Sequence, residues 1–226
     1  MRRALTLPVL AFLLLATGAC TDKSGSSTAA ADSTCKELLG DTGLIWLENR
    51  TGGPGEIEMK STEDLEQARS LFYQQVGNWD PDSTGTPSFL TAEMCKVRAD
   101  VSDSMKQLDI QYGPSLFPFD SPFDKGTDGS TKLTVTAVGS DAKLVYGNDR
   151  DGTVRYRVYV KCTIPKAPAK QENAVPIEGQ LTDTLTGETS TRVHLTRLLH
   201  SAQVMTKTLD CQNKPVVPAE PPASVT

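Results

Sequence analysis

Few residues of this sequence have the types and spacing that catalysis requires. There is no G-x-S-x-G nucleophile motif, no H-E-x-x-H zinc motif and no G-x-x-x-x-G-K phosphate loop. The two histidines, His194 and His200, lie six positions apart in one predicted helix. Six residues rotate a helix by about 240°, so the two rings cannot share one ligand. We interpret both as surface histidines and predict no catalytic residue, no metal site and no cofactor.

Acidic residues gather in the segment "DPDSTG", which begins like a calcium-binding EF-hand loop. Asp80 and Asp82 occupy its first and third positions. The twelfth position, where such a loop needs a bidentate glutamate, is Thr91. Its proline and glycine are typical of turns, so we expect a surface loop here rather than a calcium site.

An aromatic segment, "YGPSLFPFDSPF", has the composition of a binding surface. Its phenylalanines, Phe117, Phe119 and Phe123, are interleaved with three prolines. Because proline cannot donate to a strand ladder, we expect a loop rather than a central strand. The loop either exposes an apolar patch that marks a partner site or folds back as a lid over an open end of the core.

A second candidate surface lies on one predicted strand, "TVRYRVYVKCTI". Its outer face carries Arg155, Arg157, Tyr159 and Lys161. On an otherwise acidic chain, this basic face either contacts an anionic wall polymer or acidic partner, or is the solvated outer face of a sheet.

Four cysteines remain in the body of the chain once Cys20 is assigned to lipid attachment, as described below: Cys35, Cys95, Cys162 and Cys211. Zinc ligands usually come in close pairs such as C-x-x-C, and no such pair is present. An even number of cysteines in an exported chain instead favours two disulfides, for which sequence alone allows three pairings.

The elements that carry the cysteines favour one pairing. Cys95 and Cys162 lie on the inner faces of "EMCKVRADVS" and "TVRYRVYVKCTI", whose period-two alternation predicts strands. Cys35 begins a predicted helix, "CKELLGDTGLIWL", and Cys211 follows another whose apolar residues recur at helical spacing over 195–209. Each disulfide would join one helix to one strand, so we predict Cys35–Cys95 and Cys162–Cys211.

The first twenty residues, "MRRALTLPVLAFLLLATGAC", have the layout of an export signal. Arg2 and Arg3 precede an apolar stretch that is shorter than the roughly 20 residues of a bilayer span and is followed by small residues. The ending "TGAC" resembles the lipobox of bacterial lipoproteins. The resemblance implies cleavage before Cys20, diacylglycerol on its thiol, and a protein anchored to the outer face of the cell membrane. An ordinary secreted protein is the alternative.

The chain divides by composition into four parts. We expect a signal peptide over 1–19, a lipidated cysteine with a flexible tether over 20–34, a folded domain over 35–212 and a proline-rich disordered tail over 213–226. Loss of Arg2 and Arg3 shifts the formal charge from −5 to −7, which argues against nucleic acid as a partner.

The predicted fold is α+β, an antiparallel sheet with N-terminal and C-terminal helices packed over it and stapled by two disulfides. Further strands are expected at 106–112, 132–138, 142–146 and 176–183. A helix is expected within 61–79, with Ser61 or Thr62 as its N-cap. The last helix should begin after a cap at Thr189 or Ser190.

The body of the chain resembles secreted lipoproteins of actinobacteria. The similarity rests on "CKELLG", "LTAEMCKV", "YRVYVKC" and "LDCQNKPVVP", and it implies a fold and a compartment but no chemistry. We therefore expect a membrane-anchored, non-enzymatic binding or interaction protein of the cell envelope, with an envelope protein or an anionic wall polymer as its partner. The alternatives are a small-ligand carrier with a cavity between sheet and helices, and an envelope hydrolase.

Overall fold

The computed structural model describes residues 24–52, 57–99, 106–123, 133–149 and 152–226. Within these ranges, seven strands form one antiparallel sheet in the order β1-β2-β3-β7-β6-β5-β4. The strands are β1 (Glu58–Lys60), β2 (Ala92–Arg98), β3 (Gln107–Pro114), β4 (Thr134–Ala137), β5 (Ala142–Asn148), β6 (Val154–Val160) and β7 (Ile177–Asp183). The helices are α1 (Ser24–Thr51), α2 (Leu65–Gly77), α3 (Gln171–Ala174) and α4 (Thr191–Thr208). The predicted α+β class is confirmed.

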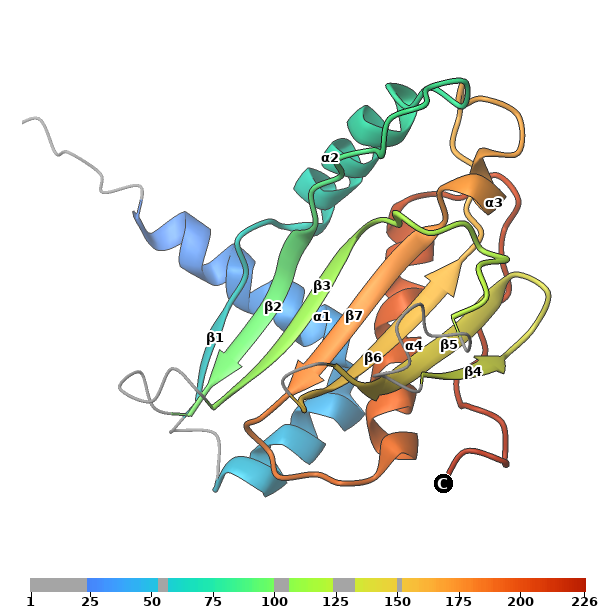
Figure 1. The fold of residues 1–226 in the computed structure, drawn as a ribbon. Coiled ribbons are helices and arrows are strands. Elements are labelled where there is room, and N and C mark those ends of the chain that lie inside the picture. Colours follow the sequence, from blue (N-terminus) through green and yellow to red (C-terminus); the bar gives the residue numbers. More distant parts are fainter. Residues whose placement is uncertain (1–23, 53–56, 100–105, 124–132, 150–151) are drawn as a thin grey trace, which may run out of the picture.

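The three longer helices pack on one face of the sheet (Figure 1). Alternate strand residues point toward them, including the cross-strand row Ile110, Leu181 and Tyr156. The apolar stripe of α4 supplies the opposing layer, with Leu195, Leu198, Leu199, Ala202 and Met205 all buried. The main hydrophobic core therefore lies between the sheet and these helices.

Tyr112 fixes α4 to the centre of the sheet. Its hydroxyl lies 2.7 Å from the Ser201 hydroxyl of α4. A β-carbon at Gly179 would stand 2.3 Å from the Tyr112 ring, so glycine is needed there to let the ring cross the neighbouring strand.

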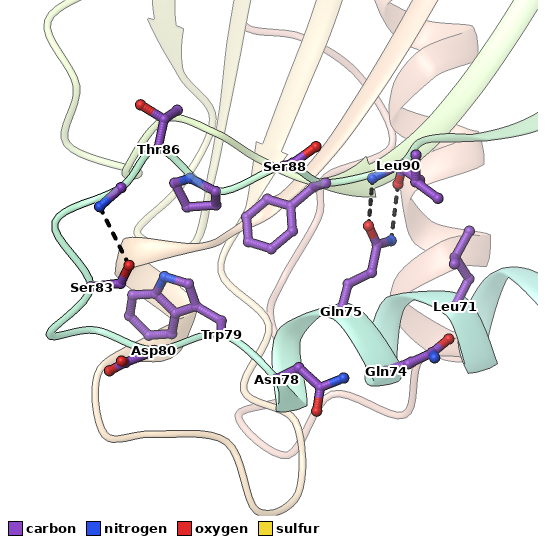
Figure 2. A pocket seen from close by; sticks show the side chains of 13 residues that line it. Leu71, Gln74, Gln75, Asn78, Trp79, Asp80, Ser83, Thr86, Ser88 and Leu90 are labelled. Atoms are coloured by element: carbon purple, nitrogen blue, oxygen red, sulfur yellow. Dashed lines mark hydrogen bonds between the residues drawn. The ribbon is translucent and has the colours of Figure 1, made fainter.

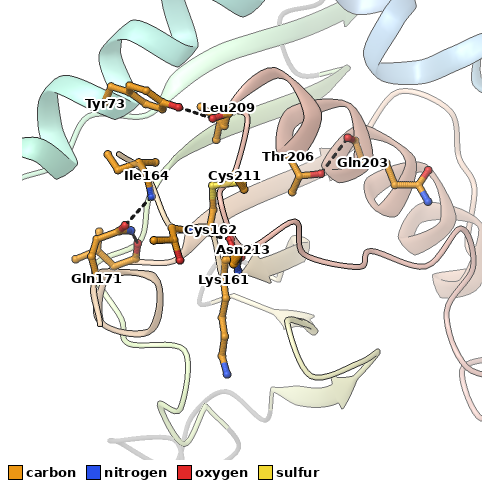
Figure 3. The surroundings of a disulfide bond; sticks show 12 residues. Tyr73, Lys161, Cys162, Ile164, Gln171, Gln203, Thr206, Leu209, Cys211 and Asn213 are labelled. Carbon is orange, nitrogen blue, oxygen red and sulfur yellow. Dashed lines mark hydrogen bonds between the residues drawn. A yellow bond between two sulfur atoms is a disulfide. The ribbon is translucent and has the colours of Figure 1, made fainter. Parts of the chain in front are cut away.

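Two disulfides join helices to strands, in the pairing that the helix–strand argument favoured. Cys35 of α1 is bonded to Cys95 of β2, and Cys162, just after β6, is bonded to Cys211, just after α4 (Figure 3). Next to the second bond, the Gln212 amide donates to the Thr163 carbonyl at 2.9 Å. The ends of β6 and α4 are therefore held by backbone pairing as well as by sulfur.

Two helices begin at residues other than the predicted ones. α2 starts after Asp64 and not after Ser61 or Thr62, because Asp64 and Gln67 form a reciprocal capping box. α1 begins at Ser24, inside the segment expected to be a flexible tether, and the three alanines at 29–31 favour a helix there. The predicted cap Ser190 does begin α4.

The proline-rich segment 213–226, predicted as a disordered tail, is ordered against α4. Val217 and Val225 are buried in the main core. Gln203 of α4 donates to the Val217 carbonyl at 2.9 Å, and Arg192 donates to the Pro222 carbonyl at 3.0 Å. Prolines have no amide hydrogen to satisfy, so an extended segment whose carbonyls are met by helix side chains can be held without secondary structure.

His194 is buried, which corrects its assignment as a surface histidine. Its Nε2 lies 2.9 Å from a carboxylate oxygen of Asp183, and its Nδ1 lies 3.0 Å from the Ser190 carbonyl. The Tyr156 ring stacks on the imidazole at 4.6 Å, and Trp46 meets it edge-on at 6.0 Å. His194 therefore joins the first turn of α4 to the end of β7. His200 is only half-buried.

Asp183 is held as a carboxylate by its hydrogen bonds. Burial alone would raise its pKa, but bonds from His194, from the side chain and backbone of Thr186 and from the Leu185 backbone together lower it. A folded-state pKa below the unfolded value of about 3.9 stabilises the fold above that pH. The contribution is lost as the pH falls through the folded pKa.

We predict that His194→Gln lowers the free energy of unfolding by about 3 kcal/mol at pH 7, because it removes the imidazole that is bonded to the buried Asp183 carboxylate and stacked on Tyr156. Urea unfolding measures the change. His200→Gln is the matched control and should cost no more than about 1 kcal/mol. Equal losses in the two variants would contradict the assignment. Asp183→Asn should also reduce the loss of stability below about pH 4.

Candidate functional site

The face of the sheet opposite the helices, here called the polar face, carries rows of hydrophilic side chains. No helix in the described ranges covers it (Figure 1). Cross-strand pairing places Asp109, Thr182 and Arg155 in one row, Gln111, Gln180 and Arg157 in the next, and Glu178, Tyr159 and Lys143 in the third. The register therefore brings the predicted basic residues of β6 beside acids and amides of β7 and β3.

The basic face expected on β6 is not a free positive surface. Arg155 forms an ion pair with Asp149 of the neighbouring turn. Arg157 Nε lies 3.5 Å from a Glu178 carboxylate oxygen on β7. Asp149 and Glu178 both lie outside β6, so the sequence of that strand alone does not predict these ion pairs. Two of the three cations of this face are therefore paired with acids.

The aromatic loop, residues 115–123, folds over one end of the polar face. Phe119 is buried, and the half-buried Phe123 stacks on Tyr159 with 4.8 Å between ring centroids. Phe117 meets Phe123 edge-on at 5.5 Å yet stays 52% exposed. Phe119 and Phe123 therefore do form a lid, but it covers the polar face in a cluster separate from the main core, while Phe117 remains at the surface.

Lys143, which sequence reasoning missed, lies beneath this lid. Its ammonium is 4.8, 4.7 and 5.7 Å from the ring centroids of Phe119, Phe123 and Tyr159. It also donates a hydrogen bond to the Phe119 carbonyl. The ammonium of a second lysine, Lys161, lies 4.4 Å from the centroid of the Phe119 ring. The alternation in "AKLVY" places Lys143 on the polar face, but nothing local predicts a loop above it.

Burial perturbs the titratable groups at this end of the sheet. It lowers the pKa of Lys143. It raises the pKa of Tyr159 and, despite Arg157 and a 3.0 Å hydrogen bond from Ser115, that of Glu178. Such shifts can mark catalytic groups, but Lys143 is only 7% exposed beneath its rings. A substrate has no direct access to its amine, so we assign Lys143 to anchoring the loop.

The anchored loop forms one wall of a groove at this end of the molecule. Leu116 and Pro118 face Trp79 and Phe89 across a cavity of about 230 Å³. A second cavity of about 480 Å³ adjoins it and shares Trp79, Asp80 and Phe89 among its lining residues (Figure 2). Leu116, Phe117 and Leu90 are exposed nearby. We call this region, residues 74–90 with 115–118, the loop end.

Gln75 holds the larger cavity in shape. The Leu90 amide donates to its side-chain oxygen, and its side-chain nitrogen donates to the Leu90 carbonyl at 3.0 Å (Figure 2). Asp80 and Asp82, from the segment similar to an EF-hand, lie in the turn on the far side. There the Asp82 amide donates to the Asp80 carboxylate at 2.9 Å. Among the described residues, no group of three or more His, Cys, Asp or Glu side chains is placed to hold a metal ion.

The layer between α2 and the sheet is tightly packed. Its cavity has room for about 10 Å³, bounded by Phe72, Tyr112 and Met205 among others. That is about the space of one water molecule. This part of the structure therefore gives no support to a ligand carried between sheet and helices. Larger cavities lie at the loop end and, with about 290 Å³, beside the end of α4 at Thr206, Asp210 and Lys214.

The chain matches no known family model, no curated protein and no solved structure. In the described ranges, none of the helices combines the length and the hydropathy needed to cross a bilayer. Cys20 and the predicted export signal lie outside the described residues.

We predict that Lys143→Ala loosens the aromatic loop and lowers the free energy of unfolding by about 1–2 kcal/mol, because the rings of the lid lose the side chain that they enclose. Hydrogen exchange at the Phe119 amide, which donates to Asn173 at 2.7 Å, should become faster. Lys207→Ala, at an exposed position of α4, is the control. Unchanged exchange at Phe119 in the Lys143 variant would contradict the anchoring role.

Proposed function

We propose that the protein is a lipid-anchored, extracytoplasmic binding protein that holds a component of the cell envelope at its loop end. The observation that carries the proposal is the loop end itself. Two adjoining cavities lie there beside exposed apolar side chains, on a loop fixed by a buried lysine. Concave sites with apolar walls and a few polar groups are the usual form of a ligand site.

The predicted export signal and the cysteines support the proposed compartment. The lipobox-like "TGAC" supports attachment of diacylglycerol to Cys20, and two disulfides suit an oxidising environment outside the cytoplasm. Two or more acyl chains anchor a protein stably where one chain does not. A binding role requires no catalytic residues. The larger cavity has one carboxylate, Asp80, among its described lining residues. A pair of carboxylates in one cleft, which would favour a hydrolase, is therefore not found there.

Replacement of the anchoring cysteine tests the compartment. Cys20→Ser should move the protein from the membrane fraction to the soluble fraction, and the adjacent Thr21→Ser should not. The intact mass of the wild-type protein should correspond to a chain starting at Cys20 with acyl groups and two disulfides. A wild-type protein without lipid would contradict the anchor.

Exposed side chains of the aromatic loop test the binding surface. We predict that, in the unlipidated Cys20→Ser protein, Leu116→Ser with Phe117→Ser reduces retention on isolated cell envelopes by about tenfold. The free energy of unfolding should change by less than about 1 kcal/mol, since both side chains are already about half exposed. Ile45→Ser, a comparably exposed position on α1, is the matched control. Equal retention of all three proteins would exclude the loop end as the binding surface.

A further inference from the structure

The larger cavity of the loop end has walls of two chemical kinds. Trp79 and Phe89 provide aromatic surface, and Leu71 and Leu90 extend it. Side-chain amides and hydroxyls line the remainder, among them Gln74, Asn78 and Ser83 (Figure 2). Amides and hydroxyls can both donate and accept hydrogen bonds. The cavity therefore offers an apolar platform bordered by groups that suit hydroxyls.

The charge of the lining restricts the ligand further. Among the thirteen described residues that line the cavity, none is Lys, Arg or His, and Asp80 is the one charged residue. An anionic ligand would find no cation to pair with and a carboxylate to repel it. A lipid chain would leave the amide and hydroxyl groups without partners. A ligand with one apolar face, a rim of hydroxyls and no negative charge satisfies both walls.

From this lining we infer that the cavity binds a neutral saccharide, which rests on the proposed function and specifies its envelope component. A pyranose ring has a face of C–H groups that packs on an aromatic ring and a rim of hydroxyls that both donate and accept. Trp79 is the platform. Asn78, Gln74 and Asp80 line the same cavity and carry groups that bond hydroxyls, and about 480 Å³ suits a small saccharide.

The cavity is built before the ligand arrives. Trp79 follows directly on the C-cap of α2, where its amide donates to the Val76 carbonyl at 3.2 Å. The opposite wall is tied to the same helix by the two hydrogen bonds between Gln75 and Leu90. Both walls are therefore attached to α2, so ligand binding does not need to order them.

Saturation-transfer NMR tests the inference with cellobiose, maltose and N,N′-diacetylchitobiose as neutral probes and glucuronate as an anionic comparator. We expect transfer to the C–H protons of at least one neutral probe and none to glucuronate. Trp79→Ala should weaken that binding by about tenfold or more, while Trp79→Phe retains part of it. Trp46→Phe, a change at the buried tryptophan on the helix side, is the matched control and should bind like the wild type.

Either of two results would overturn the inference. One is no transfer to any neutral probe at millimolar concentration, and the other is transfer that Trp79→Ala leaves unchanged. Retention on cell envelopes separates this failure from that of the proposed function. If retention is lost in the Leu116→Ser, Phe117→Ser variant while no saccharide binds, the loop end is a binding surface for another component. If that variant is still retained, the proposed function has failed as well.

Discussion

Two disulfides fix the first and last long helices on one face of the sheet, and the rest of the structure depends on this one-sided arrangement. Cys35–Cys95 holds α1 against β2, and Cys162–Cys211 holds the end of α4 against β6. They close loops of 60 and 49 residues, which corresponds to about 4 kcal/mol each in the chain-entropy model. With the helices placed there, the main core forms on that face, and the other face must be stabilised differently.

The polar face meets that requirement with paired charges and one small apolar cluster. Arg155 and Arg157 are neutralised by acids from adjacent segments. At the edge away from α1, the aromatic loop covers Lys143 and forms its own cluster with Val145 and Tyr159. Because this lid is anchored, its remaining side chains stay in place at the surface beside Trp79. The proposed site is thus a consequence of how the uncovered face is closed.

Local patterns predicted what depends on neighbours in the chain. Period-two alternation placed Cys95 on a strand, and helical spacing placed the leucines of α4 in the core, whereas Cys162 lies just beyond the end of β6. The burial of His194 could also have been predicted, since it lies four residues before Leu198 on the same helical face. Contacts between segments that are distant in the chain leave no comparable pattern in the sequence. Lys143 is covered by a loop some twenty residues earlier, Arg157 is paired with Glu178 of β7, and Val217 is buried despite a proline-rich neighbourhood.

We propose one binding surface, at the loop end, and a structural role for the polar face and the helices. Chemical-shift mapping tests this most directly, by titrating isotope-labelled protein with solubilised cell-wall fragments. Perturbations should be confined to residues 74–90 and 115–118, with the Trp79 indole among the largest. Perturbations centred instead on α1 or α4, or on the row of Asp109, Thr182 and Arg155, would contradict the account.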